Sequence, residues 1–191
     1  MNLLVIRHPE PLGSQGVCYG QSDLSVDPAV LELIASRLRQ QLAGSKVDLW
    51  LSSPLQRCSQ LAARLDPGYQ TDPRLLEMNF GDWEGQRWDD IDRTDLDTWS
   101  ADYINAAPPG GESFMALQQR VASLLADLRQ RELSEVAVVS HAGVIRALLS
   151  LVLGIPLEST WRIEVRFGAL LRLRLGAAEY QNRLLELSGG D

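Results

Sequence analysis

The sequence contains few of the residues that mark secreted, metal-binding or membrane-spanning proteins. Its 191 residues include only two histidines and two cysteines, Cys18 and Cys58. This small cysteine count does not suggest a disulfide framework or a zinc knuckle, so we expect reduced thiols and a cytoplasmic protein. No basic segment precedes the first apolar run, so we expect no signal peptide. The longest apolar stretch, residues 144–155, is interrupted by Arg146 and is too short to span a bilayer, so we expect no membrane partner.

An excess of positive charge is also missing, because the formal net charge is -7. We therefore expect no nucleic-acid partner, although a few arginines gathered at one place can still bind a small anion. The apolar fraction of 45% and the charged fraction of 23% are ordinary for a globular protein. The length fits one domain over residues 1–191, and we make no prediction of the oligomeric state.

The apolar pattern alternates between strand-like and helix-like segments. Short apolar runs predict buried strands at Leu3–Ile6, Val47–Leu51 and Val136–Val139. Capping residues and helical spacing predict helices after Asp27-Pro28, from Ser53-Pro54, over residues 114–128 and over residues 143–153. Residues 66–111 look irregular, and the tail predicts three further strands at residues 162–167, 170–175 and 182–187. This order predicts an α/β fold, a three-layer α/β/α sandwich with a mainly parallel central sheet.

Chemically capable side chains follow each of the first three predicted strands. Arg7-His8 follows the first strand, Ser53 and Arg57 follow the second, and His141 follows the third. Ligands of open parallel sheets bind beyond the carboxyl ends of the strands. The topology therefore predicts that both histidines and two arginines meet at one edge of the sheet.

This set of residues suits phosphoryl transfer. Two guanidinium groups can hold a phosphate by charge-assisted hydrogen bonds, and helix N-termini near Ser53 and Gly143 add backbone donors. A neutral imidazole can attack phosphorus, and nearby guanidinium groups disfavour its protonation. The second histidine can donate to the non-bridging oxygens, and the leaving oxygen needs a proton from an acid such as a carboxylic acid.

Each of these residues also has a simpler structural interpretation when taken alone. His8 would be a hydrogen-bonded structural histidine, Arg57 a solvated helix residue and His141 a loop residue. Two histidines are too few for a zinc site without placed carboxylates or thiolates, so we predict no metal and no other cofactor. The stretch "GDWEG", residues 81–85, lacks the glycine-lysine spacing of a phosphate loop. The convergence of both histidines and both arginines at one edge of the sheet is what favours a functional site.

Five segments resemble, in order, the signature segments of the histidine phosphatase superfamily, also called the phosphoglycerate mutase-like family. They are "IRHPE", "SSPLQRCSQLA", "LLEMNFGDWEG", "PPGGES" and "VVSHAGVIRALL", and the match as a whole runs from Leu3 to about Leu153. Within the superfamily, "GVCYGQSDLSV" looks most like the alpha-ribazole phosphatase branch, which acts late in cobalamin assembly. The resemblance implies a phosphoglycerate mutase-like fold.

The resemblance also implies a role for individual residues. His8 would be the nucleophile that becomes phosphohistidine, and Arg7, Arg57 and His141 would bind the phosphoryl group. Glu77, within "LLEMNFG", would donate a proton to the leaving group and later assist water. Without the resemblance, Glu77 would be one loop carboxylate among the 25 acidic residues of the chain.

The chain departs from the family pattern near the proposed nucleophile. Pro9 stands where the family usually has glycine, and Ser14 stands where it usually has a phosphate-binding asparagine. Ser14 can still donate one hydrogen bond to phosphate, over a shorter reach. The segment between His8 and Gly20 also looks shorter than in the mutases, so we expect altered leaving-group recognition.

We therefore predict a metal-independent phosphomonoesterase that acts through phosphohistidine on a small phosphorylated metabolite, with alpha-ribazole 5′-phosphate as the candidate. The alternatives are a phosphoglycerate-type phosphomutase and a catalytically weak protein that binds a phosphorylated ligand. Loops over Leu12–Asp23 and Gly81–Gly111 would contact the leaving group. Their tryptophans would either form an apolar wall for an aromatic or sugar-linked group or serve only in packing.

Overall fold

The central feature of the computed structural model, which describes residues 1–189, is a six-stranded sheet. Four strands run parallel, in the order β3-β2-β4-β1, and β5 and β6 extend the sheet with antiparallel pairing on β1 and β5. Their bounds are β1 Asn2–Arg7, β2 Leu49–Ser52, β3 Gln70–Thr71, β4 Glu135–Ser140, β5 Leu170–Arg174 and β6 Arg183–Ser188. The predicted mainly parallel α/β fold is confirmed.

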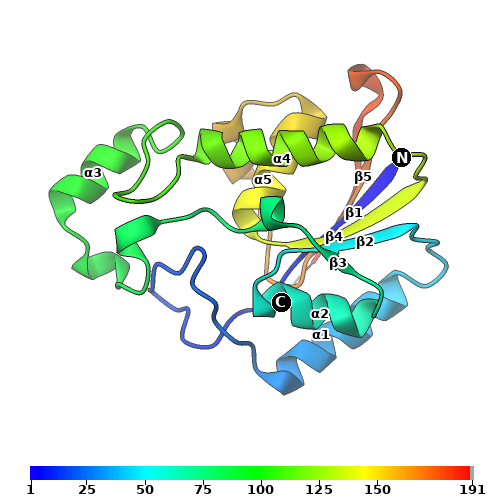
Figure 1. The fold of residues 1–191 in the computed structure, drawn as a ribbon, viewed down its shortest axis with the longest axis horizontal. Coiled ribbons are helices and arrows are strands. Elements are labelled where there is room, and N and C mark those ends of the chain that lie inside the picture. Colours follow the sequence, from blue (N-terminus) through cyan, green and yellow to red (C-terminus); the bar gives the residue numbers. More distant parts are fainter. Residues whose placement is uncertain (190–191) are drawn as a thin grey trace.

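Helices cover both faces of this sheet, as Figure 1 shows. One pair packs below the sheet in that view and the other pair above it, while a fifth helix, α3, stands at the far left. Their bounds are α1 Pro28–Gln41, α2 Gln56–Leu65, α3 Arg93–Ala101, α4 Phe114–Arg129 and α5 Ala142–Leu153. Short 3₁₀ helices complete the fold: η1 Pro73–Leu75, η2 Gly81–Trp83, η3 Trp88–Asp90, η4 Leu157–Arg162 and η5 Glu179–Gln181.

The apolar run of β1 is continuous because both of its faces are buried. Leu3 and Val5 join the cluster formed with α4 and α5, whereas Leu4 and Ile6 join the cluster formed with α1 and α2. Successive strand side chains point to opposite faces, so two apolar layers require an unbroken apolar strand. The central strands are therefore held rigidly, and so are the residues at their carboxyl ends.

Helix α2 begins at Gln56, later than the predicted start at Ser53-Pro54. The Ser53 amide still donates to the carbonyl of Val139 at 2.9 Å, so Ser53 extends the sheet edge. Leu55 caps the helix in an extended conformation, and the Gln56 amide donates to Asp23 Oδ1 at 2.7 Å. A carboxylate of the protein therefore occupies part of the helix N-terminus that we had expected to bind phosphate.

The predicted strand at residues 162–167 is wrong. This segment is the end of η4 and an irregular stretch, and Gly168 then turns with a φ of 71° before β5 begins. The Val165 carbonyl, which a ladder would use, accepts a hydrogen bond from Arg7 Nη1 at 2.5 Å. Arg7 thus takes a carbonyl that an additional strand would have used for pairing.

The segment predicted to be irregular contains helix α3. Its N-cap, Asp92, accepts hydrogen bonds from the amides of Thr94 and Asp95. None of its residues is buried, so the apolar periodicity that identified the other helices is missing here. No helix in the described part of the chain is both long enough and apolar enough to cross a membrane.

Candidate active site

The two histidines lie together at the carboxyl ends of the central strands. The His8 and His141 ring centroids are 5.0 Å apart, and the rings meet at 63°. The His8 amide donates to the carbonyl of Ser140 at 3.0 Å, which joins the ends of β1 and β4. Both side chains are buried. The predicted convergence of the histidines is therefore present in the fold.

The backbone sets the proton position on His8. Its Nδ1 lies 2.6 Å from the carbonyl oxygen of Pro9. A carbonyl can only accept, so Nδ1 carries the proton and the neutral ring keeps its lone pair on Nε2. Proline fixes its own φ, and this restricts where the accepting carbonyl can lie. Pro9 therefore helps to present His8 Nε2 as the nucleophilic atom.

His141 has the opposite tautomer. Arg57 Nε donates to His141 Nδ1 at 3.3 Å, and a guanidinium group can only donate. The ring proton is therefore on Nε2, which donates to Ser53 Oγ at 2.8 Å. The Ser53 hydroxyl does not depend on this bond, because it can accept from other groups. A phosphoryl oxygen could therefore replace it and accept a hydrogen bond from the Nε2–H of His141.

Both histidines are held in the neutral form. Burial, followed by repulsion from Arg57, lowers the pKa of His8 well below its usual 6.5. Burial, followed by repulsion from His8 and Arg57, lowers the pKa of His141 well below 6.5 as well. We predicted guanidinium repulsion as the cause for His8, and in the fold it acts as the second cause after desolvation. A dianionic phosphoryl group would balance the local positive charge.

The guanidinium group of Arg7 contacts the segment between η4 and β5. Its Nη1 donates to Val165, and its Cζ lies 3.8 Å from the centroid of the Phe167 ring. Burial lowers the pKa of Arg7, and the charges of Tyr19 and Glu77 oppose this effect. A planar guanidinium group held by a carbonyl and an aromatic face is oriented before any ligand arrives.

Arg57 is completely buried, with an exposed fraction of 0%, although it lies on a helix. Its Nη1 donates to the carbonyl of Ser22 at 2.7 Å, and its Nη2 donates to the carbonyl of Gly20 at 2.6 Å. Together with His141 Nδ1, these acceptors fix the plane of the guanidinium group. The interpretation of Arg57 as a solvated helix residue is therefore excluded.

The Glu77 carboxylate lies at the N-terminus of α5. Its Oε2 accepts from the Gly143 amide at 3.2 Å, and its Oε1 accepts from the Met78 amide at 2.9 Å. A Cβ added at Gly143 would lie 2.3 Å from Glu77 Oε1, so only glycine permits this approach. Part of the helix N-terminus expected to bind phosphate is thus occupied by Glu77. Its location next to a strand end became visible only in the fold.

Ser14 is separate from this group. Its hydroxyl donates to the carbonyl of Pro11 at 2.9 Å, and the residue is buried. The geometry brings Arg7, His8, Arg57, Glu77 and His141 together, and it gives the predicted phosphate contact of Ser14 no support.

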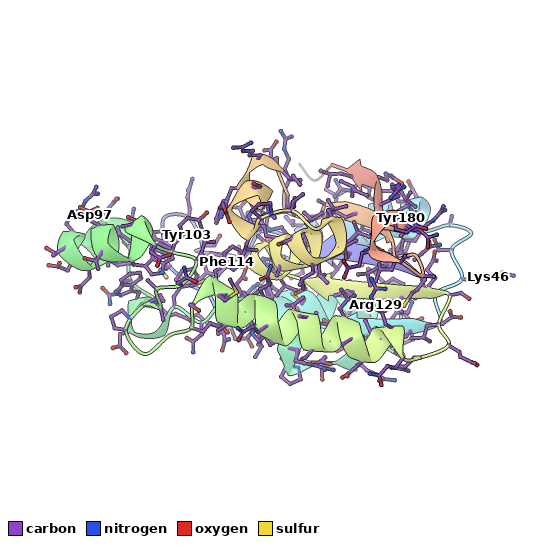
Figure 2. All side chains as sticks on the ribbon, turned by 90° about the horizontal axis from the view of Figure 1, so that it is seen from above. Lys46, Asp97, Tyr103, Phe114, Arg129 and Tyr180 are labelled. Atoms are coloured by element: carbon purple, nitrogen blue, oxygen red, sulfur yellow. The ribbon has the colours of Figure 1, made fainter. Side chains whose placement is uncertain are left out.

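A cavity of about 380 Å³ is lined by Arg7 and Glu77 of this group, and by Ala142 and Gly143, which follow His141 in the chain. Arg7, Glu77 and Gly143 line its polar part, and Arg146 also reaches it. The rest of the wall is aromatic, formed by Tyr19, Phe80, Trp88, Trp99, Tyr103, Phe114 and Trp161. Figure 2 shows Tyr103 and Phe114 near one another on the side of the molecule where α3 lies, with Phe114 at the start of α4. The cavity therefore joins a charged end to an aromatic end.

The tryptophans serve in packing and in lining the cavity, and Trp88 and Trp99 do both, because they also pack against the cluster of Cys18, Trp83 and Ile91. Trp83 is buried with Cys18 and Ile91 in a small separate cluster, so it serves packing. Trp88, Trp99 and Trp161 line the cavity. Within residues 1–189, no group of three or more histidine, cysteine or acidic side chains is placed to hold a metal ion.

The model of the histidine phosphatase superfamily (branch 1) matches residues 3–187 of this chain. The chain therefore belongs to that superfamily. The adenosylcobalamin/alpha-ribazole phosphatase of Escherichia coli (strain K12) is 35% identical over 178 residues, which cover 88% of this chain and 87% of that protein. Phosphoserine phosphatase 1 of Hydrogenobacter thermophilus is 27% identical over 172 residues, covering 84% of this chain and 80% of that protein.

The fold is also similar to that of a solved relative. The crystal structure of the alpha-ribazole phosphatase from Shigella flexneri has a TM-score of 0.88 at 30% identity, covering 99% of this chain and 96% of that chain. Family and relatives together identify this chain as a phosphatase, a hydrolase that acts on a phosphate ester. The family resemblance found in the five sequence segments is confirmed.

Proposed function

We propose that this chain hydrolyses alpha-ribazole 5′-phosphate, a nucleoside-like ester with an aromatic base, through a phosphohistidine at His8 and without a metal. One observation carries the proposal: a single cavity has Arg7 and Glu77 at one end and aromatic side chains at the other. A phosphoryl group suits the charged end, and a flat heterocycle suits the aromatic end. Two of the similar proteins, from Escherichia coli and Shigella flexneri, are alpha-ribazole phosphatases.

The first half-reaction forms a bond between phosphorus and nitrogen. Arg7, Arg57 and the Nε2–H of His141 bind the phosphoryl oxygens, and His8 Nε2 attacks phosphorus. The bond from phosphorus to the ester oxygen breaks, and Glu77 in its acid form donates a proton to that oxygen. The phosphorylated ring is cationic, and the Pro9 carbonyl 2.6 Å from Nδ1 stabilises it.

The second half-reaction returns the enzyme to its starting state. The Glu77 carboxylate takes a proton from a water molecule, whose oxygen attacks phosphorus. The bond between phosphorus and Nε2 breaks, its electron pair returns to His8, and inorganic phosphate leaves. No step in this scheme needs a metal ion or a redox cofactor.

The mechanism is tested with alpha-ribazole 5′-phosphate and p-nitrophenyl phosphate, each with and without a chelator. We expect His8→Ala to lose activity by about 10⁴-fold or more, as when a nucleophile is removed from other enzymes. We expect chelation to change nothing. Full activity in His8→Ala, or complete loss of wild-type activity on chelation, would contradict the mechanism.

The substrate is tested with a panel that adds phosphoserine and 3-phosphoglycerate. Among the three metabolites we expect the largest kcat/KM for alpha-ribazole 5′-phosphate, because the leaving groups of phosphoserine and 3-phosphoglycerate have no ring to stack on the aromatic wall. An equal or larger kcat/KM for phosphoserine would contradict this assignment. Transfer of the phosphoryl group to a phosphoglycerate, with little free phosphate released, would instead identify a mutase.

A further inference from the structure

The Glu84 side chain accepts hydrogen bonds from a short loop, residues 20–22. This glutamate belongs to the "GDWEG" stretch, which takes no part in the reaction scheme above. Its Oε1 accepts from the amides of Gln21 at 2.7 Å and Phe80 at 3.1 Å. Its Oε2 accepts from the Ser22 amide at 2.5 Å and from the Ser22 hydroxyl at 2.6 Å. One carboxylate therefore satisfies four donors, most of them in residues 20–22.

The same loop faces the active site with its other polar groups. The carbonyls of Gly20 and Ser22 accept from Arg57 Nη2 at 2.6 Å and Nη1 at 2.7 Å. Gln21 Nε2 donates to the Glu77 carbonyl at 3.0 Å. The loop thus lies between Glu84 on one side and Arg57 and Glu77 on the other.

The loop fits this position closely. A Cβ added at Gly20 would lie 2.3 Å from the Met78 carbonyl oxygen and 2.5 Å from Glu84 Oε1. The Gly20 backbone is therefore in direct contact with the Glu84 carboxylate and with the segment that carries Glu77. A change in the Glu84 carboxylate is therefore transmitted to the carbonyls that hold Arg57.

We propose that Glu84 is a positioning residue that aligns Arg57 and Glu77 through residues 20–22. This inference rests on the proposed function, because it assigns Arg57 to the phosphoryl group and Glu77 to the leaving group. A guanidinium group has five N–H donors, and here three acceptors fix its plane, which also fixes the direction of the N–H donors left on Nη1 and Nη2. Loss of the two carbonyls would let that direction vary.

The main test is Glu84→Gln. The amide of glutamine has one accepting oxygen, and its NH₂ group takes the place of the other carboxylate oxygen. This NH₂ group must face either the amides of Gln21 and Phe80 or the amide of Ser22. In both cases N–H donors then face N–H donors. We expect kcat/KM to fall by about 10- to 100-fold, since small misplacements of reacting groups have effects of this size. We also expect the inhibition constant of inorganic phosphate to rise, because Arg57 would hold the anion less well.

Asp48→Asn provides a matched control. Asp48 also accepts two backbone hydrogen bonds, from the amides of Ser134 at 2.7 Å and Glu135 at 3.0 Å, at the opposite end of the parallel strands. This variant makes the same carboxylate-to-amide change and removes the negative charge that both amides share at Oδ2, without touching the active site. We expect its Tm to fall while its kcat/KM and its inhibition by phosphate match the wild type.

Gln21→Ala keeps the inference testable if Glu84→Gln does not fold. It removes only the hydrogen bond to the Glu77 carbonyl, so it leaves the loop backbone in place. We expect a larger loss with an alkyl phosphate, whose leaving oxygen needs a proton, than with p-nitrophenyl phosphate. Equal effects on the two esters would contradict the link to Glu77.

The outcomes separate the inference from the function on which it rests. Glu84→Gln with the kinetics and phosphate inhibition of Asp48→Asn, beside an inactive His8→Ala, would overturn the inference alone. Full activity in His8→Ala would overturn the proposed function and this inference together. A folded Glu84→Gln with weak phosphate inhibition and low kcat/KM supports the positioning role.

Discussion

The two ends of the cavity are held by different kinds of interaction. At the charged end, Arg7 is fixed by a backbone carbonyl, and in the catalytic group to which it belongs carbonyls also fix Arg57, while His8 and His141 each have a defined tautomer. At the aromatic end, rings touch rings: Trp99 and Tyr103 are 6.2 Å apart between centroids, and so are Tyr103 and Trp161. Hydrogen bonds fix direction, whereas ring contacts allow many arrangements.

The elements that supply the two ends differ in the same way. The charged end rests on the ends of β1 and β4 and on helix α2, which pack into the main apolar clusters. The aromatic end comes largely from residues 80–103 and from η4, and helix α3 there has no buried residue. We infer that the sheet determines the chemistry and the peripheral segment determines the leaving group.

The sharpest test of this division is Arg57→Gln. We expect kcat to fall by about 10²–10³-fold with every ester, because a donor to the transition state is lost. Arg39→Gln is the control, since Arg39 lies on the surface in an ion pair with Glu32. The division would fail if Arg57→Gln affected one leaving group and spared another.

A smaller loss is expected from Gly143→Ala. Alanine forms helices better than glycine does, so helix α5 itself should not suffer. The new Cβ would collide with Glu77 Oε1 at 2.3 Å and displace the proton donor. We expect kcat for an alkyl phosphate to fall by about tenfold or more, and kcat for p-nitrophenyl phosphate to fall less. A uniform effect on both esters would place Glu77 outside proton transfer.

Trp161→Ala removes one ring of the aromatic wall, over which Arg146 Cζ lies at 4.3 Å from the centroid. The side chain is 57% exposed, so its removal leaves the core intact. We expect kcat/KM for alpha-ribazole 5′-phosphate to fall by about tenfold, since stacking of a base on an aromatic ring contributes roughly 1–3 kcal/mol. Kinetics with phosphoserine should not change. Tyr180→Ala is the control, because Figure 2 places Tyr180 at the other end of the molecule and it is 78% exposed.

The smallest effect concerns stability and pH. Burial lowers the pKa of His8 and of His141 in the folded chain, so the unfolded chain binds more protons as pH falls below about 6.5. The neutral histidines therefore make their full contribution to the free energy of unfolding above that pH. This contribution is lost as the pH falls towards the pKa values of the histidines in the folded chain. We expect Tm to drop between pH 7 and pH 5, and His8→Gln to show a shallower slope. Equal slopes in the two proteins would contradict this account.

The regular elements around the sheet could be predicted because their signals are local. Helix α1 begins where Asp27 accepts from the amides of Ala29 and Val30, and α4 begins where Ser113 accepts from Ala116. The errors arose where distant residues decide. Arg7 takes the Val165 carbonyl from a predicted strand, and Asp23 caps α2 at Gln56.

The candidate site, too, could be predicted from the sequence only in part. Strand ends in a parallel sheet meet at one edge, so the order of residues was enough to bring Arg7, His8 and His141 together. Glu77 was found only through family resemblance, because a loop carboxylate has no local signal for chemistry. Packing alone places it against Gly143, which lies 66 residues away in the chain.

Periodicity and strand order thus establish the sheet, its carboxyl edge and the two histidines gathered there, because these depend on neighbours in the chain. The protonated nitrogen of each ring, the wall formed by Trp88, Trp99 and Trp161, and the support of Arg57 by Glu84 depend on contacts across the fold. Hydrogen bonds and ring contacts act over a few ångströms. They are therefore decided only when packing has brought distant segments that close.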